Sequence, residues 1–97
     1  MRSDCVRLFG MNGTEEFATG VAEHLNIPLS PHTEEYWDDG EFYVKSGANV
    51  RSCDCYVISS LYTDSTERVS EKAMKLLYFV GSLFDASASR ITVVCPY

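Results

Sequence analysis

The chain has 97 residues, of which 45% are hydrophobic and 23% are charged, and its formal net charge is −6. A chain of this length fits one domain, residues 1–97, because folding can bury roughly 60 to 65% of its accessible surface. It has neither the roughly 20 apolar residues of a membrane span nor a signal-peptide pattern, so we expect a cytoplasmic protein with no membrane partner. Its eight Lys and Arg residues are scattered, which argues against nucleic acid as a partner.

A strand is predicted over residues 5–9, followed by the turn GMNGT and a helix that Thr14 can cap and Pro28 ends. The apolar side chains of this helix recur at four-residue steps. They are Phe17, Val21 and Leu25, with Ala18 and Ala22 beside them. The two glycines of the turn could cradle a phosphate, but they match neither nucleotide-binding fingerprint, so a simple strand-to-helix turn is the preferred interpretation.

A second strand is predicted over residues 41–46, where apolar and polar side chains alternate. The dipeptide Asp39-Gly40 precedes it, and both residue types tolerate positive φ, as hairpin turns require. The pattern therefore predicts an antiparallel partner strand over residues 32–37.

Residues 55–59 and 91–95 are continuous apolar runs, which are typical of strands covered on both faces. Between them, residues 66–85 have helical periodicity, with a Glu71–Lys75 pair expected on the exposed side. The expected buried stripe comprises Val69, Ala73, Leu76, Leu77, Val80, Leu83 and Phe84. A strand, a helix and a strand in this order form a right-handed crossover, so the predicted fold class is α/β with a mostly parallel sheet and one hairpin near residue 40.

The cysteines, Cys5, Cys53, Cys55 and Cys95, show no metal-binding or redox spacing, and we expect buried structural thiols. His24 and His32 have no partner at ligand spacing, so no metal site is predicted. Ser59 and Ser60 end a strand without a recognisable base, and no catalytic residue is assigned. The acidic residues gather at Glu34, Glu35, Asp38, Asp39 and Glu41, where a solvated turn is the simplest interpretation.

Four segments together carry a family resemblance: WDDGE with a following valine, NVR, D-x-YVISS and DASASRITVVCPY. In this order and spacing they resemble the amino-terminal domain of the ribose-phosphate pyrophosphokinase family. The resemblance implies a phosphoribosyltransferase-like, Rossmann-like fold. It also implies an enzyme that uses Mg²⁺ and ATP to transfer a pyrophosphoryl group to ribose 5-phosphate, in a homo-oligomer.

The resemblance assigns an adenine-binding role, toward a neighbouring subunit, to Trp37, Asp39 and Glu41. The indole could stack on the base while the carboxylates accept from its exocyclic amine. It assigns an allosteric phosphate or ADP site to Asn49 and Arg51, with Ser87 contributing. A guanidinium suits phosphate oxygens, but Arg51 could equally neutralise the acidic turn, and both interpretations stay open.

The chain also departs from the family pattern. SEKAMKL at residues 70–76 replaces N-D-N-L-M-E-L, which puts the subunit contact of that helix in doubt. The loops that hold ATP phosphates and sugar phosphate in the family would follow the final PY. We therefore expect a truncated amino-terminal domain that is inactive alone and binds no cofactor tightly. The alternatives are a free-standing relative that binds nucleotide or regulates a full-length synthetase, and a flavodoxin-like domain with another partner.

Overall fold

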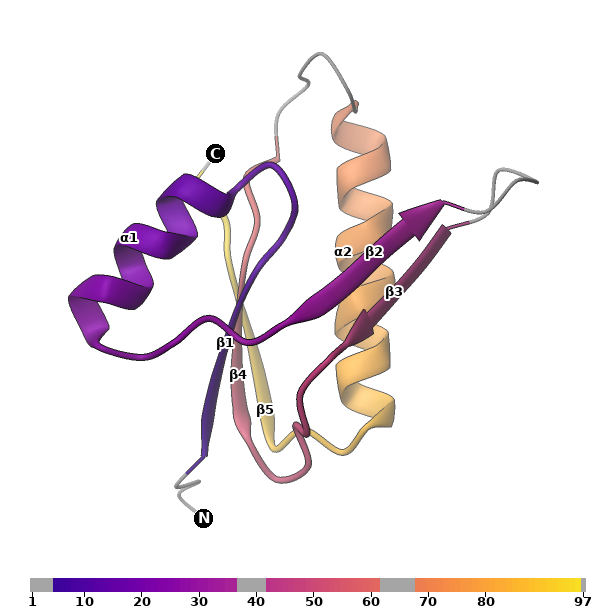
Figure 1. Ribbon diagram of the computed structural model, residues 1–97. Helices are drawn as coiled ribbons and strands as arrows, with labels where there is room; N and C mark the ends of the chain where they lie inside the picture. The colour runs from indigo at the N-terminus through magenta and orange to yellow at the C-terminus, as the bar shows by residue number, and fades with distance from the viewer. Residues whose placement is uncertain (1–4, 37–41, 62–67, 97) are drawn as a thin grey trace.

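The computed structural model describes residues 5–36, 42–61 and 68–96 (Figure 1). Its elements follow the predicted order, with bounds that differ from the predicted ones by one or two residues at most ends. They are β1 (Val6–Gly10), α1 (Glu15–Leu25), β2 (His32–Tyr36), β3 (Phe42–Ser46), β4 (Asp54–Ile58), α2 (Val69–Asp85) and β5 (Arg90–Val94).

The main sheet has the strand order β1-β4-β5, and both of its pairings are parallel. This confirms the α/β class and the crossover through α2. The predicted hairpin is also confirmed, since β2 pairs antiparallel with β3 and Tyr36 lies opposite Phe42. The hairpin is a separate two-stranded sheet that lies against α2, whereas α1 lies on the other side of the main sheet (Figure 1).

Two hydrophobic clusters fill the two sides of the main sheet, because successive side chains of a strand point to opposite faces. On β1, Leu8 joins the cluster under α1, and Phe9 joins the cluster under α2. The phenyl rings of Phe9 and Phe79 meet edge to face, with centroids 5.1 Å apart, an arrangement that aromatic pairs prefer.

The apolar stripe predicted for α1 is wrong in part, because Ala18 and Ala22 are the residues that α1 buries, while the side chains of Phe17 and Leu25 are about half exposed. The helix lies too close to β1 for large side chains between them. A Cβ atom placed on Gly10 would stand 2.5 Å from the Cβ of Ala18. Glycine at the end of β1 therefore permits this close approach.

The face of α2 also differs from the prediction. Leu76, Phe79 and Leu83 are buried, whereas Leu77 is 68% exposed and Phe84 is 73% exposed. Apolar side chains of α2 occur around most of its circumference. Periodicity alone therefore did not determine which side of the helix faces the sheet. The contact between Phe79 and Phe9 turns the side of residues 76, 79 and 83 toward the sheet.

Strand β5 was expected to be covered on both faces, and this expectation is wrong. It pairs with β4 and lies at an edge of the sheet, with Val93 and Val94 partly exposed. After a crossover helix, a central strand and an edge strand can both have a continuous apolar sequence. The sequence pattern therefore could not show which of the two β5 is.

The expectation of four buried free thiols is wrong for one pair, because Cys5 and Cys53 form a disulfide. Each precedes its strand by one residue, and β1 and β4 pair in the register Val6 to Asp54. The two cysteines therefore lie side by side, with Cα atoms 4.6 Å apart, within the usual range for a disulfide. Cys55 is buried and free, as expected, whereas Cys95 is free but exposed, which also departs from the expectation of buried thiols.

Candidate functional site

The predicted residues Asn49 and Arg51 lie in a tight turn at the amino-terminal edge of β4, called here the 49–53 turn (Asn49–Cys53). The Asn49 side-chain Oδ1 accepts a hydrogen bond from the Arg51 backbone N–H (3.1 Å). The Cys53 backbone N–H donates to the carbonyl oxygen of Val50 (2.9 Å), and Ser52 adopts a left-handed conformation with φ 61°. Side-chain and backbone contacts thus hold the turn from within.

The structure brings Ser87 next to this turn, although Ser87 lies 35 positions after Ser52 in the sequence. The Ser52 backbone N–H donates to the carbonyl oxygen of Ser87 (2.9 Å). The Ser89 backbone N–H donates to the carbonyl oxygen of Cys53 (2.8 Å), which adds a second link. Ser87 itself has φ 69°. The residues that the sequence resemblance assigned to one effector site therefore lie in adjoining segments.

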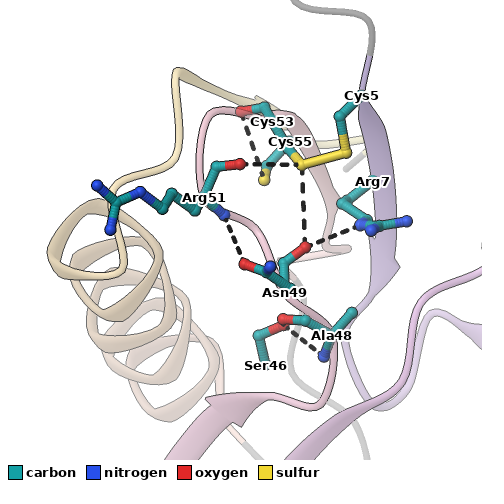
Figure 2. The surroundings of a disulfide bond; sticks show 8 residues. All are labelled: Cys5, Arg7, Ser46, Ala48, Asn49, Arg51, Cys53 and Cys55. Carbon is teal, nitrogen blue, oxygen red and sulfur yellow. Dashed lines mark hydrogen bonds between the residues drawn. A yellow bond between two sulfur atoms is a disulfide. The ribbon is translucent and has the colours of Figure 1, made fainter.

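The surroundings of the 49–53 turn are shown in Figure 2. The Nε of Arg7 donates to the carbonyl oxygen of Asn49 (3.0 Å), which ties the turn to β1. The Arg51 side chain extends away from the disulfide and is exposed (Figure 2). Among the described residues its guanidinium has no hydrogen-bond or ion-pair partner, and it forms no ion pair with Glu34 or Glu35. An exposed guanidinium on a fixed turn is available to an anion.

The predicted adenine-binding residues, Trp37, Asp39 and Glu41, lie outside the described residues. The strands on either side of them are described, and the pairing of Tyr36 with Phe42 fixes the points where this segment begins and ends.

A buried polar cluster at the opposite end of the sheet was missed by the sequence analysis. We call it the Glu34 cluster (Asn12, His32, Glu34 and Lys75). The Glu34 Oε2 accepts a hydrogen bond from the Asn12 backbone N–H (2.7 Å) and lies 2.5 Å from the His32 Nε2. The Glu34 Oε1 lies 3.7 Å from the Lys75 Nζ. The expected exposed Glu71–Lys75 pair is therefore wrong, because Lys75 turns inward and is 6% exposed.

The electrostatics of the Glu34 cluster favour an ionised carboxylate. Burial alone would raise the pKa of Glu34, but the hydrogen bonds from His32 and Asn12 lower it, as do the positive charges of His32 and Lys75. The net result is a Glu34 pKa below its ordinary value. The carboxylate of Glu34 therefore joins three parts of the fold: the hairpin, α2 and the loop after β1.

The turn after β1 proves to be a simple strand-to-helix turn. The Asn12 backbone N–H donates to Glu34, and the Gly13 backbone N–H donates to the Oε1 of Glu15 (2.8 Å). Carboxylates of the chain thus already accept from two of the turn amides that could otherwise contact a phosphate. Thr14 stands at the N-cap position of α1 as predicted, but its Oγ1 makes no cap hydrogen bond and instead accepts from the Ser60 backbone N–H (3.1 Å).

Two signals in the sequence could have revealed the Glu34 cluster. His32 and Glu34 alternate along β2, so they share one face. Lys75 stands four residues before Phe79, which places it on the buried side of α2. Both signals were obscured because Glu34 was counted with the acidic turn and Lys75 with Glu71.

A pocket of about 690 Å³ lies alongside α1 and is lined in part by Phe17, Val21 and Leu25. It contains none of the residues of the 49–53 turn. Within residues 5–36, 42–61 and 68–96, no three His, Cys, Asp or Glu side chains gather as a metal-ligand set, so none is assigned to Mg²⁺. In the same ranges, no helix combines the length and apolar character needed to cross a membrane.

Comparison with known proteins places this geometry in a family. The family described as the N-terminal domain of ribose phosphate pyrophosphokinase matches residues 6–97. The chain is 33% identical to the ribose-phosphate pyrophosphokinase of Bacillus subtilis and 37% identical to that of Haemophilus influenzae. Each match spans 92 residues, 95% of this chain and 28% of the relative.

A solved structure is similar as well. The phosphoribosylpyrophosphate synthetase of Mycobacterium smegmatis superposes with a TM-score of 0.85 at 28% identity, over 97% of this chain and 30% of that one. The chain thus spans less than a third of the length of these relatives. Because the family match extends from β1 to the last residue of the sequence, the chain belongs to the family of ribose-phosphate pyrophosphokinase amino-terminal domains.

Proposed function

We propose that the chain serves as the amino-terminal domain of a cytoplasmic ribose-phosphate pyrophosphokinase. Such an enzyme converts ATP and ribose 5-phosphate into phosphoribosyl pyrophosphate and AMP, with Mg²⁺, for nucleotide biosynthesis. Membership of the family and the similar fold of a solved synthetase support this proposal. In it, the domain contributes binding and subunit contacts within a homo-oligomer, while the remainder of a full-length enzyme contributes the catalytic loops.

The 49–53 turn is proposed to receive the phosphate groups of an effector, either inorganic phosphate or ADP. The observation that carries this role is the hydrogen bond from the Ser52 backbone N–H to the carbonyl oxygen of Ser87, which joins the two candidate segments. The exposed guanidinium of Arg51 offers a planar pair of donors to phosphate oxygens. Asn49 contributes by holding the backbone of Arg51 through its side chain.

Trp37, Asp39 and Glu41 are proposed to contact adenine in the ATP site of a neighbouring subunit. An indole offers a large face for stacking, and carboxylates accept hydrogen bonds from an exocyclic amine. The alternative role of Arg51, neutralising the charge of the acidic turn, is tested by the phosphate and ADP titrations described next.

The effector role is tested by titrating the chain with ADP and, separately, with inorganic phosphate while recording amide chemical shifts. We expect the Ser52 and Ser87 amides to shift, and Arg51→Ala to weaken binding at least about tenfold, because charge-assisted contacts to phosphate are lost. Lys45→Ala is the matched control, since it removes one exposed positive charge from β3. Equal weakening in both variants would refute a specific role for Arg51.

The adenine role is tested by calorimetric titration with Mg-ATP, before and after Trp37→Ala. Heat of binding that disappears in the variant supports the stacking role. Binding that survives the substitution unchanged contradicts it.

A further inference from the structure

The Cys5–Cys53 disulfide joins the last residue of the 49–53 turn to the residue before β1. Cys5 precedes β1, and Cys53 is the last residue of the turn (Figure 2). Cys53 also accepts the backbone hydrogen bond from Ser89 (2.8 Å), so one residue joins the disulfide, the turn and the segment after α2. A change at this sulfur is therefore transmitted to the contacts that arrange the turn.

The two cysteine residues differ in exposure. Cys5 is only partly buried, whereas Cys53 is 3% exposed. Because exchange depends on which residue can be approached, the step below takes the Sγ of the more exposed Cys5 as the attacked sulfur and the Sγ of Cys53 as the leaving group.

In the reduced form, the thiol proton of Cys53 has hydrogen-bond acceptors nearby. The Cys53 Sγ lies 3.5 Å from the carbonyl oxygen of Arg51 and 3.8 Å from that of Asn49. A disulfide sulfur carries no hydrogen and cannot donate to these oxygens. Once the bond opens, the thiol of Cys53 can donate to either one, and at the Asn49 oxygen it competes with the Arg7 Nε (3.0 Å), the contact that ties the turn to β1. The Asp54 backbone N–H still donates to the carbonyl oxygen of Cys5 (2.8 Å), so the strands remain paired without the sulfur bond.

The remaining thiols do not compete with this pair. Cys55 is fully buried, and burial raises the pKa of its thiol, with a further rise from the charge of Asp54. Its thiolate is therefore scarce, and the thiolate is the form that attacks disulfides. Cys95 is exposed and follows β5, at the opposite end of the parallel sheet from Cys5.

We propose that Cys5 and Cys53 form a reversible redox switch that sets the conformation of the 49–53 turn. The reductant is a dithiol. One of its thiolates attacks the Cys5 Sγ, Cys53 leaves as a thiolate and takes a proton, and the second reductant thiol then closes the reductant disulfide and releases the Cys5 thiol. The protein gains two electrons and two protons, which the dithiol loses. In a reducing compartment, disulfides are usually catalytic or redox-sensing rather than permanent.

The switch does not depend on the proposed effector role and is tested without a ligand. The folded 97-residue chain is treated with excess dithiothreitol and then with oxidised glutathione. The state of each cysteine is read by alkylation and mass spectrometry, and amide hydrogen exchange is measured in both forms. We expect the exchange of the Ser52 and Ser89 amides to rise about tenfold or more on reduction, while the core amides of Phe9 and Val57 change by less than about twofold.

Two variants complete the test. Cys5→Ser should show the fast turn exchange in every buffer, and Cys95→Ser should behave as the unchanged chain because it leaves the pair intact. The proposal is overturned if the pair stays oxidised in excess dithiol or stays reduced in oxidised glutathione. It is also overturned if the turn amides exchange equally in both forms, or if the core amides of Phe9 and Val57 accelerate as much as those of the turn.

Discussion

Lys75 of α2 and Glu34 of β2 form a buried ion pair, with the lysine Nζ 3.7 Å from the carboxylate Oε1. Both side chains are almost fully inaccessible, at 7% and 2% exposure. Burying either charge alone would cost several kcal/mol of solvation free energy. The opposite charge and the surrounding hydrogen bonds offset this cost. The pair therefore joins the hairpin to the helix that it lies against.

Replacing Glu34 by Gln should lower the free energy of unfolding by about 1–3 kcal/mol, because the buried Lys75 then loses its attraction to the charge of Glu34. Urea denaturation followed by circular dichroism measures the change. The matched control is Glu35→Gln, on the next residue of the same strand, where the side chain is exposed. It should change stability by less than about 0.5 kcal/mol. Equal effects of the two substitutions would contradict the buried pair.

The Glu34 cluster should also make stability depend on pH under acidic conditions. Since the folded-state pKa of Glu34 is lowered, its carboxylate contributes stability that is complete above the unfolded pKa of about 4.3 and is lost as pH falls through the folded value. Urea midpoints measured from pH 7 to pH 3 should fall more steeply for the unchanged chain than for Glu34→Gln. Parallel curves for the two proteins would refute this linkage.

The close approach of α1 to β1 predicts opposite effects for alanine at two glycines. Gly10→Ala should destabilise the chain by about 1–3 kcal/mol, because its Cβ would stand 2.5 Å from that of Ala18. Gly20→Ala lies on α1 with no atom within 4 Å of the new Cβ, and it should stabilise by about 0.5–1 kcal/mol through helix propensity. Thermal unfolding of both variants gives the comparison, and stabilisation by Gly10→Ala would contradict the tight packing.

The 97-residue chain alone should not transfer a pyrophosphoryl group. Catalysis of phosphoryl transfer depends on cations and donors positioned around the phosphates, and no catalytic role is assigned to any residue within 5–36, 42–61 and 68–96. The measurement is an assay with radiolabelled ATP, Mg²⁺ and ribose 5-phosphate, with heat-denatured chain as the blank. Label in phosphoribosyl pyrophosphate above the blank would disprove the prediction.

The order of the elements was predictable from the sequence because each has a strong local signal. The β-branched runs of β4 and β5, the periodicity of α2 and the dipeptide before β3 depend on neighbouring residues only. What could not be predicted depends on contacts between distant segments. The bond between Cys5 and Cys53 follows from the register of β1 against β4, and no local pattern contains that register.

The candidate site was likewise predictable in some respects and not in others. The family resemblance pointed to Asn49, Arg51 and Ser87, and the structure explains how they come together, through left-handed conformations at Ser52 and Ser87. Neither conformation has a glycine to signal it. The inward turn of Lys75 was missed because a lysine with a glutamate four residues before it normally indicates a solvated pair.

The position of β5 at the sheet edge has a consequence for handling this domain. In the described part of the chain, β5 pairs on one side only, so the other side presents backbone N–H and C=O groups without strand partners. Its run of Ile91, Thr92, Val93 and Val94 has no charge to discourage a second strand, although Arg90 and Pro96 flank it. Edges of this kind invite pairing with another chain. At high concentration the domain should lengthen its sheet by strand addition, and a charged residue at Val93 should prevent it.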